Sequence, residues 1–103
     1  MYVAIFGQKL IYSVISEMEL LSYSGITELE ENSIKSLLAD CEEIALSTEI
    51  KEKTIELRKK YRTKLPDAIV AASAIVKGVP LITADKGFNQ IEELNLEMIV
   101  PVV

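Results

Sequence analysis

The stretch that decides the fold is LPDAIVAASAIVKGVPLITAD, residues 65–85. Its proline suits the first turn of a helix, and the residues that follow Asp67 are apolar on nearly all sides, which is typical of a buried helix. Gly78 is a natural C-terminal cap for that helix. Val79–Thr83 favours a β-strand, and Asp85 follows it in a loop. The stretch therefore predicts a buried helix that leads directly into a strand.

Strands and helices alternate along the rest of the chain. Thr27 and Glu30 have the spacing of a helix capping box, and Ser47 or Thr48 can cap the next helix. This alternation predicts an α/β fold with a mainly parallel sheet. The chain has 103 residues and no repeat or long linker, so we expect a single domain over residues 1–103. Strands are predicted over residues 1–6, 10–15, 44–46, 79–83 and 97–100, and helices over residues 16–21, 27–41, 48–61, 67–77 and 88–94.

Composition limits the available chemistry. The sequence has no histidine, which excludes Ser–His–Asp and Cys–His hydrolysis, histidine-based ribonuclease chemistry and most zinc sites. Any catalysis would rest on carboxylates with a hard metal ion. Cys41 is the only cysteine, and neither a signal peptide nor a membrane-length apolar stretch is evident, so we expect a cytoplasmic protein with no membrane association. The net charge of −5 argues weakly against a dedicated nucleic-acid binder.

Three acidic residues are expected to meet at one edge of the sheet. A helix of roughly 12 residues rises roughly 18 Å, and a strand of about five or six residues covers a similar distance back. Asp67, which opens the helix, should therefore lie near Asp85, which follows the strand. Glu19 follows the predicted strand that ends at Ile15, and it joins them if the two strands are parallel. Three carboxylates repel one another, and Mg²⁺ or Mn²⁺ would relieve that repulsion.

Each of these residues also has an ordinary structural explanation. Asp67 can favour the helix dipole, and Asp85 can form a turn before the following Lys-Gly pair. Glu19 can be a solvated helix residue, since Glu17 is close and equally acidic. The basic residues that precede Pro66 can be a solvated helix end. Geometry alone leaves these explanations and a metal site about equally open.

Three segments in this order resemble the PIN-domain ribonuclease family of bacterial toxin–antitoxin systems. They are SVISEMELLSY (residues 13–23), KLPDAIVAASA (64–74) and LITADKGF (81–88). The resemblance implies a three-layer α/β fold, with a mainly parallel sheet of four or five strands and helices on both faces. It assigns the metal, Mg²⁺ or Mn²⁺, to Glu19, Asp67 and Asp85, with Thr83 as a supporting catalytic residue. It prefers Glu19 to Glu17 because the family's glutamate precedes a leucine. The implied reaction is metal-assisted attack of water on an RNA phosphodiester.

The resemblance extends from Lys9 to Pro101, and the family's first strand has no counterpart. That strand normally ends in an aspartate that binds metal, whereas no aspartate precedes Asp40 here. We therefore expect an N-terminally truncated PIN-like domain whose first central strand is missing, with weak or absent RNA cleavage. The alternative is a catalytically inactive PIN remnant that binds an antitoxin or itself. A receiver-like phosphoacceptor domain is less favoured, because no paired acids follow Phe6.

The resemblance also implies partners, namely RNA, a cognate antitoxin protein and a second copy that forms a homodimer. A run of basic residues precedes Asp67 and is expected to contact RNA phosphates, which would offset the acidic total. The run consists of Arg58, Lys59, Lys60, Arg62 and Lys64.

Residues 1–6 are predicted to fill the place of the missing strand. They are apolar and strand-like, and their connection to the next strand is too short for a parallel crossover. A connection this short can only make a hairpin, so Tyr2–Phe6 should pair antiparallel with Leu10–Ile15. The alternative, about equally favoured, is a strand supplied by a partner chain, which would make a dimer obligate.

Overall fold

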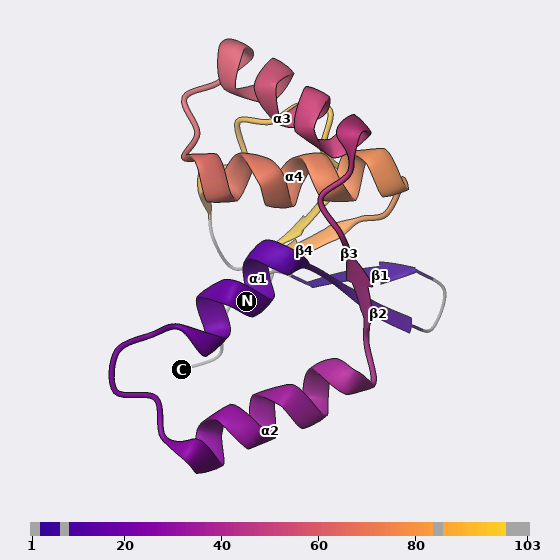
Figure 1. Cartoon of the computed structure of the whole chain (residues 1–103). Coiled ribbons are helices and arrows are strands. Elements are labelled where there is room, and N and C mark those ends of the chain that lie inside the picture. The colour runs from indigo at the N-terminus through magenta and orange to yellow at the C-terminus, as the bar shows by residue number, and fades with distance from the viewer. Residues whose placement is uncertain (1–2, 7–8, 84–85, 99–103) are drawn as a thin grey trace.

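A computed structural model describes residues 3–6, 9–83 and 86–98 (Figure 1). Its strands are β1 (Val3–Phe6), β2 (Lys9–Ser13), β3 (Glu42–Ile44), β4 (Leu81–Thr83) and β5 (Leu96–Met98). Its helices are α1 (Val14–Leu21), α2 (Glu28–Ala39), α3 (Thr48–Lys60) and α4 (Leu65–Lys77), with a 3₁₀ turn, η1 (Lys86–Phe88), before β5.

The strands of the described chain form one sheet in the order β3-β2-β1-β4-β5. β2 is parallel to β3 and β4 is parallel to β5, whereas β1 is antiparallel to both of its neighbours, β2 and β4. Because β2 and β4 both run against β1, all strands other than β1 share one direction. The predicted α/β fold with a mainly parallel sheet is confirmed.

The hairpin predicted at the amino end is confirmed over the described residues. Val3 pairs with Tyr12 and Phe6 pairs with Lys9, so β1 and β2 are antiparallel neighbours. On its other side β1 pairs with β4, where Val3 lies opposite Ile82. β1 therefore occupies the middle of the sheet with strands on both sides, and this chain supplies that strand itself. Tyr2 lies outside the described residues.

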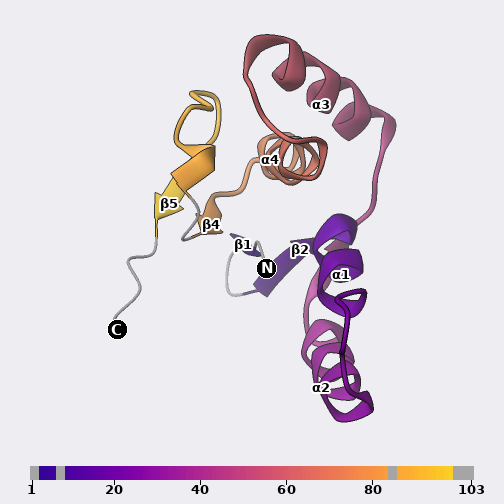
Figure 2. The same ribbon diagram turned by 90° about the vertical axis from the view of Figure 1, so that its left-hand side faces the viewer.

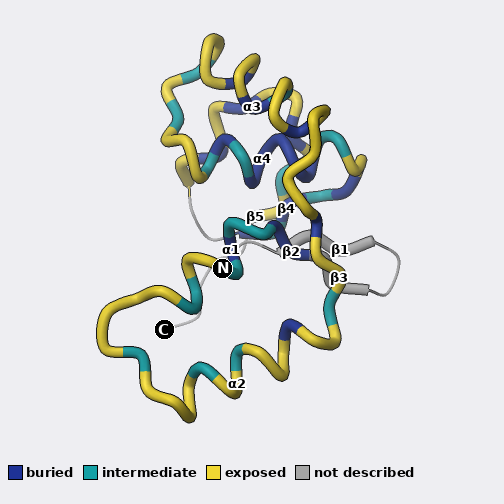
Figure 3. Tube along the Cα trace, viewed as in Figure 1, coloured by how far each residue is buried: buried dark blue, intermediate teal, exposed yellow. Residues whose placement is uncertain are grey.

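The core lies between the sheet and the helix pair α3–α4, which covers one face of the sheet (Figure 1, Figure 2). α4 is buried along most of its length, as its apolar sequence predicts. Leu57 of α3 and Phe88 of η1 are almost fully buried in the same cluster. α1 and α2 form an arm at the β2–β3 end of the sheet, and in α2 only Leu38 is buried (Figure 3). This arm meets the main body where α1 contacts α4.

Local cap chemistry sets several helix ends where the sequence predicts them. Thr27 Oγ1 accepts from Glu30 N at 3.1 Å, and Thr27 N donates to Glu30 Oε1 at 3.3 Å, which completes the capping box. Ser47 Oγ accepts from Ile50 N at 3.2 Å at the start of α3. Gly78 ends α4 with a φ of 68°, the left-handed conformation that favours glycine.

The boundary between β2 and α1 differs from the prediction. β2 ends at Ser13, and Val14 and Ile15, which were expected to extend the strand, begin α1. Ser13 Oγ accepts from Ile15 N at 3.2 Å, so Ser13 caps this helix. Ser16, the predicted cap, is buried. β3 is likewise shifted, to Glu42–Ile44.

The predicted helix over residues 88–94 is wrong. The single 3₁₀ turn η1 ends at Phe88, and turns and irregular backbone continue to β5. Leu81 N donates to Asn95 O at 2.9 Å, and Gln90 Nε2 donates to Arg62 O at 2.7 Å. These bonds join the segment to β4 and to the α3–α4 connection, a constraint that the local sequence does not contain.

Candidate functional site at the carboxyl edge of the sheet

The carboxyl ends of the parallel strands gather at one edge of the sheet. β2 ends at Ser13 and leads into α1, and β4 ends at Thr83. Both strands run against β1, so these ends lie at the same edge, on either side of Val3. The first turn of α4 lies at this edge too, because α4 runs opposite to β4 (Figure 1). Open α/β sheets bind their ligands at this edge.

Glu19 lies on α1 and is exposed to solvent, whereas Glu17 on the same helix is half-buried. The side chains of Glu17 and Glu43 are hydrogen-bonded, next to the buried Tyr12. Desolvation first, and then the hydrogen bond and charge of Glu17, raise the pKa of Glu43 above its ordinary value. Two positions on a helix that are two residues apart point to different sides. Glu17 is therefore engaged with β3, and Glu19 is the acid of α1 that remains open to solvent.

Asp67 lies in the first turn of α4 and is half-buried. Thr83, the last residue of β4, is buried. Helix α1 contacts α4, so Glu19 and Asp67 belong to helices that lie side by side near the carboxyl edge. Asp85, the third predicted metal ligand, lies outside the described residues.

A hard divalent cation is chemically compatible with the donors at this edge. The carboxylates of Glu19 and Asp67 and the hydroxyl of Thr83 present only oxygen, the ligand that Mg²⁺ and Mn²⁺ prefer. Within residues 3–6, 9–83 and 86–98, no group of three His, Cys, Asp or Glu side chains is placed to hold a metal ion. The described chain thus offers two of the three predicted carboxylates, and the complete set stays a prediction that depends on Asp85.

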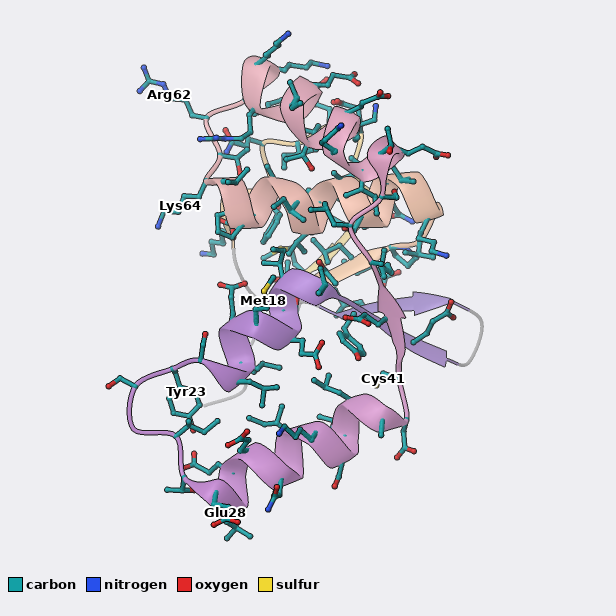
Figure 4. The ribbon with its side chains drawn as sticks, viewed as in Figure 1. Met18, Tyr23, Glu28, Cys41, Arg62 and Lys64 are labelled. Carbon is teal, nitrogen blue, oxygen red and sulfur yellow. The ribbon has the colours of Figure 1, made fainter. Side chains whose placement is uncertain are left out.

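The predicted basic run lies at the end of α3 and in its connection to α4. Arg62 and Lys64 extend away from the helices at the amino end of α4 (Figure 4). Lys60 Nζ lies 3.3 Å from Glu93 Oε1, so this cation already has a carboxylate partner. Among the residues that the structure describes, the other four members of the basic run form no ion pair. Those members are Arg58, Lys59, Arg62 and Lys64.

A hydrogen-bond network around Tyr61 was not predicted from the sequence. The Tyr61 hydroxyl donates to Glu93 Oε1 and accepts from Glu92 N at 3.2 Å. The bond from Tyr61 is the main reason that the pKa of Glu93 lies below its ordinary value. Tyr61 and Glu93 are 32 positions apart in the sequence, so no local pattern reveals the pair. The network holds the α3–α4 connection against the segment that precedes β5.

A comparison with known protein families identifies the family of this chain. The profile of the PIN domain matches residues 4–94, which is most of the chain. The chain belongs to the PIN domain family. A comparison of this PIN domain with curated proteins gave no significant match. In the described residues, no helix has the length and apolar character needed to cross a membrane.

This PIN domain is similar to solved structures of toxin–antitoxin proteins. VapBC2 from Rickettsia felis, solved bound to a DNA fragment from its promoter, is 26% identical with a TM-score of 0.76, over 85% of this chain and 73% of that one. A toxin–antitoxin complex from Klebsiella pneumoniae is 33% identical with a TM-score of 0.69, over 80% and 68%. VapBC-5 from Mycobacterium tuberculosis, at 20% identity, a TM-score of 0.63 and coverage of 82% and 75%, shares the fold. The predicted family is thus confirmed.

Proposed function

We propose that this PIN domain is a metal-dependent endoribonuclease of the toxin–antitoxin type. The observation that carries the proposal is the contact between α1 and α4, the helices that carry Glu19 and Asp67. Family membership and the similarity to VapBC structures support it. The substrate class proposed is RNA.

In this proposal Glu19, Asp67 and Asp85 hold Mg²⁺ or Mn²⁺, and the Thr83 hydroxyl supports the site from the end of β4. A bound divalent ion would polarise the phosphate and lower the pKa of water. The half-buried position of Asp67 suits a ligand that must hold its place, and the exposed position of Glu19 leaves its carboxylate accessible. The basic run beside Asp67, from Arg58 to Lys64, would hold the RNA backbone.

A second function, binding without catalysis, is favoured by one observation. β1 is antiparallel to its neighbours, so the residue that it places next to the carboxyl ends of β2 and β4 is Val3. A valine cannot supply a carboxylate at the centre of this edge. With fewer charged ligands a site holds Mg²⁺ less tightly. We therefore propose that cleavage is weak, and that an inactive form would still bind an antitoxin or a second copy.

The partners proposed are an antitoxin protein and a second copy of this chain. The arm formed by α1 and α2 leaves large apolar side chains open to water, including Met18, Leu29 and Leu37. Exposed apolar surface of this kind often marks a protein interface. The similarity to VapBC complexes supports an antitoxin partner, and the free thiol of Cys41 suits the cytoplasm that we propose for this chain.

Cleavage of a labelled RNA with and without Mg²⁺ or Mn²⁺ tests the enzyme proposal. We expect slow, metal-dependent cleavage that Asp67→Asn abolishes, because the substitution removes a charged metal ligand. Asp40→Asn is the matched control, since Asp40 is an exposed residue that ends α2. Cleavage that persists in Asp67→Asn would overturn the assigned site. If the unaltered chain does not cleave RNA with either metal, even when the protein is in excess over RNA, only the binding function remains.

A further inference from the structure

A pocket of about 520 Å³ lies where α3 ends and its connection to α4 begins. Three cationic residues, Arg58, Lys59 and Arg62, line one part of it. Ile55 and Leu65 line another part, and each is 50% exposed. The pocket therefore presents positive charge and apolar surface to the same ligand, and its volume is typical of a site for a small organic group.

The walls of this pocket are held in place before any ligand arrives. Arg58 Nε donates to Thr63 O at 3.4 Å, and Gln90 Nε2 donates to Arg62 O at 2.7 Å. Tyr61, which also lines the pocket, is fixed through its hydroxyl by Glu93 and by Glu92 N. A preorganised wall loses less entropy when it binds. The three cations that line it have no ion-pair partner among the described residues, so their charge is available to an anion.

We propose that this pocket is a subsite for one unpaired nucleotide of RNA. Its base lies against Ile55 and Leu65, and its flanking phosphates contact Arg58, Lys59 and Arg62. The inference rests on the proposed function, which supplies RNA as the substrate class. The position of the pocket favours RNA over an acidic protein segment, because Leu65 and Asp67 both belong to the first turn of α4, so the pocket lies at the same end of that helix as the proposed catalytic edge. A base in a duplex could not reach the apolar wall, so the subsite requires an unpaired strand.

Binding of two fluorescent oligomers in EDTA, where metal-dependent cleavage cannot proceed, tests the subsite. One probe is a 12-residue oligouridylate, and the other is an abasic 12-mer with the same phosphates and no bases. In the Ile55→Ser/Leu65→Ser variant we expect the oligouridylate to bind about tenfold more weakly, because the base loses its apolar contacts, with the abasic probe nearly unchanged. In Arg58→Gln/Arg62→Gln both probes should weaken by similar factors. Leu46→Ser is the matched control, because Leu46 is 54% exposed and precedes the start of α3, whereas the pocket lies at the other end of that helix.

Each other outcome overturns the subsite in a recognisable way. Equal binding of the oligouridylate by the apolar variant and the unaltered chain would show that no base occupies the pocket. An equal loss for both probes in the Ile55→Ser/Leu65→Ser variant would show that the apolar wall does not contact a base. No binding of either probe would overturn the subsite and RNA as the substrate class together. Cleavage is measured separately with Mg²⁺, so a chain that binds as expected but does not cleave keeps the subsite and loses only the proposed activity.

Discussion

At the scale of single residues, the surroundings of Glu43 shift its pKa. It lies opposite Tyr12 in the register of β2 and β3, and the carboxyl group of Glu17 is hydrogen-bonded to it. Desolvation and this neighbour raise its pKa above the ordinary value of 4.5. The folded state therefore favours the protonated form. Its contribution to stability is full below the unfolded pKa and is lost as the pH rises through the folded pKa.

Glu43→Gln should raise the melting temperature at pH 7 and have little effect at pH 4. The amide removes the repulsion between two carboxylates, and at pH 4 the native carboxyl is already largely protonated. Because Glu43 is exposed to solvent, the rise should stay below about 4 °C, the shift that 1 kcal/mol gives in a domain of this size. Glu42→Gln, on the opposite face of the same strand, is the control for thermal melts at both pH values. Equal stabilisation by Glu43→Gln at pH 4 and pH 7 would show that the carboxyl pair is not the cause.

The choice between Glu17 and Glu19 shows how much the sequence can predict about single residues of the candidate site. Periodicity and composition gave the two acids equal standing, and only the resemblance to a family motif preferred Glu19. The structure adds a physical difference, because Glu17 is engaged with Glu43 while Glu19 is exposed. That difference arises from the pairing of β2 with β3, which no local pattern encodes. Asp85 lies outside the described residues, so its role stays a prediction.

At the scale of elements, helix ends were predictable wherever a cap acts within a few residues. The capping box of Thr27 and Glu30, the serine cap of α3 and the glycine at the end of α4 are all present. Elements that depend on distant partners were not predictable in the same way. The segment after Phe88 has a sequence compatible with a helix, yet its hydrogen bonds to Arg62 and β4 hold it in turns.

Gly78→Ala should destabilise the fold by about 1–2 kcal/mol, through backbone strain alone. A Cβ atom built at Gly78 meets nothing within 4 Å, so no clash contributes to the loss. Asparagine tolerates the left-handed conformation better than alanine. Urea unfolding should therefore rank the glycine first, Gly78→Asn second and Gly78→Ala last. If the asparagine and alanine variants were equally unstable, the φ of 68° would not be the origin of the loss.

Ala4→Pro should abolish cooperative folding, because β1 has a neighbour on each side. Ala4 lies opposite Ile11 in β2 and opposite Leu81 in β4. Proline cannot donate to either ladder and is found in sheets almost only at edges. Circular dichroism should show loss of structure and of a cooperative melt. Ala4→Ser keeps the backbone donor and should remain folded. A proline variant that melts cooperatively near the temperature of the serine variant would place β1 outside the sheet.

At the scale of the whole molecule, the positive charge of the basic run is concentrated in one place. The net charge is −5, yet the basic run is concentrated at one end of the main body, at Arg62 and Lys64, while the acidic first turn of α2, with Glu28, lies on the arm at the far end (Figure 4). Net charge alone is therefore a poor guide to nucleic-acid binding, because it averages over surfaces that face different ways. The alternation of strands and helices in the sequence did predict that β2, β3, β4 and β5 run parallel to one another.

The salt dependence of RNA binding should report the three cations of the pocket. For a single strand each phosphate contact contributes about −0.7 to the slope of log K against log salt, so Arg58, Lys59 and Arg62 should together contribute about −2 to that slope. Lys59→Gln should reduce this to about −1.4. Lys35→Gln, whose parent lysine pairs with Glu31 on α2, should leave the slope unchanged. An unaltered slope in Lys59→Gln would remove that lysine from the interface.

The direction of β1 also has a practical consequence for fusion proteins. Because β1 runs against its neighbours, Val3 is its residue closest to the carboxyl edge, so β1 begins at the same edge as the proposed active site. β5 is parallel to β4 and therefore points its own carboxyl end the same way. A polyhistidine tag carries metal-binding imidazoles, which would compete for the ion in any assay of metal dependence. Tag-free protein, or a tag removed by a protease, is therefore the appropriate material for every assay that involves a divalent ion.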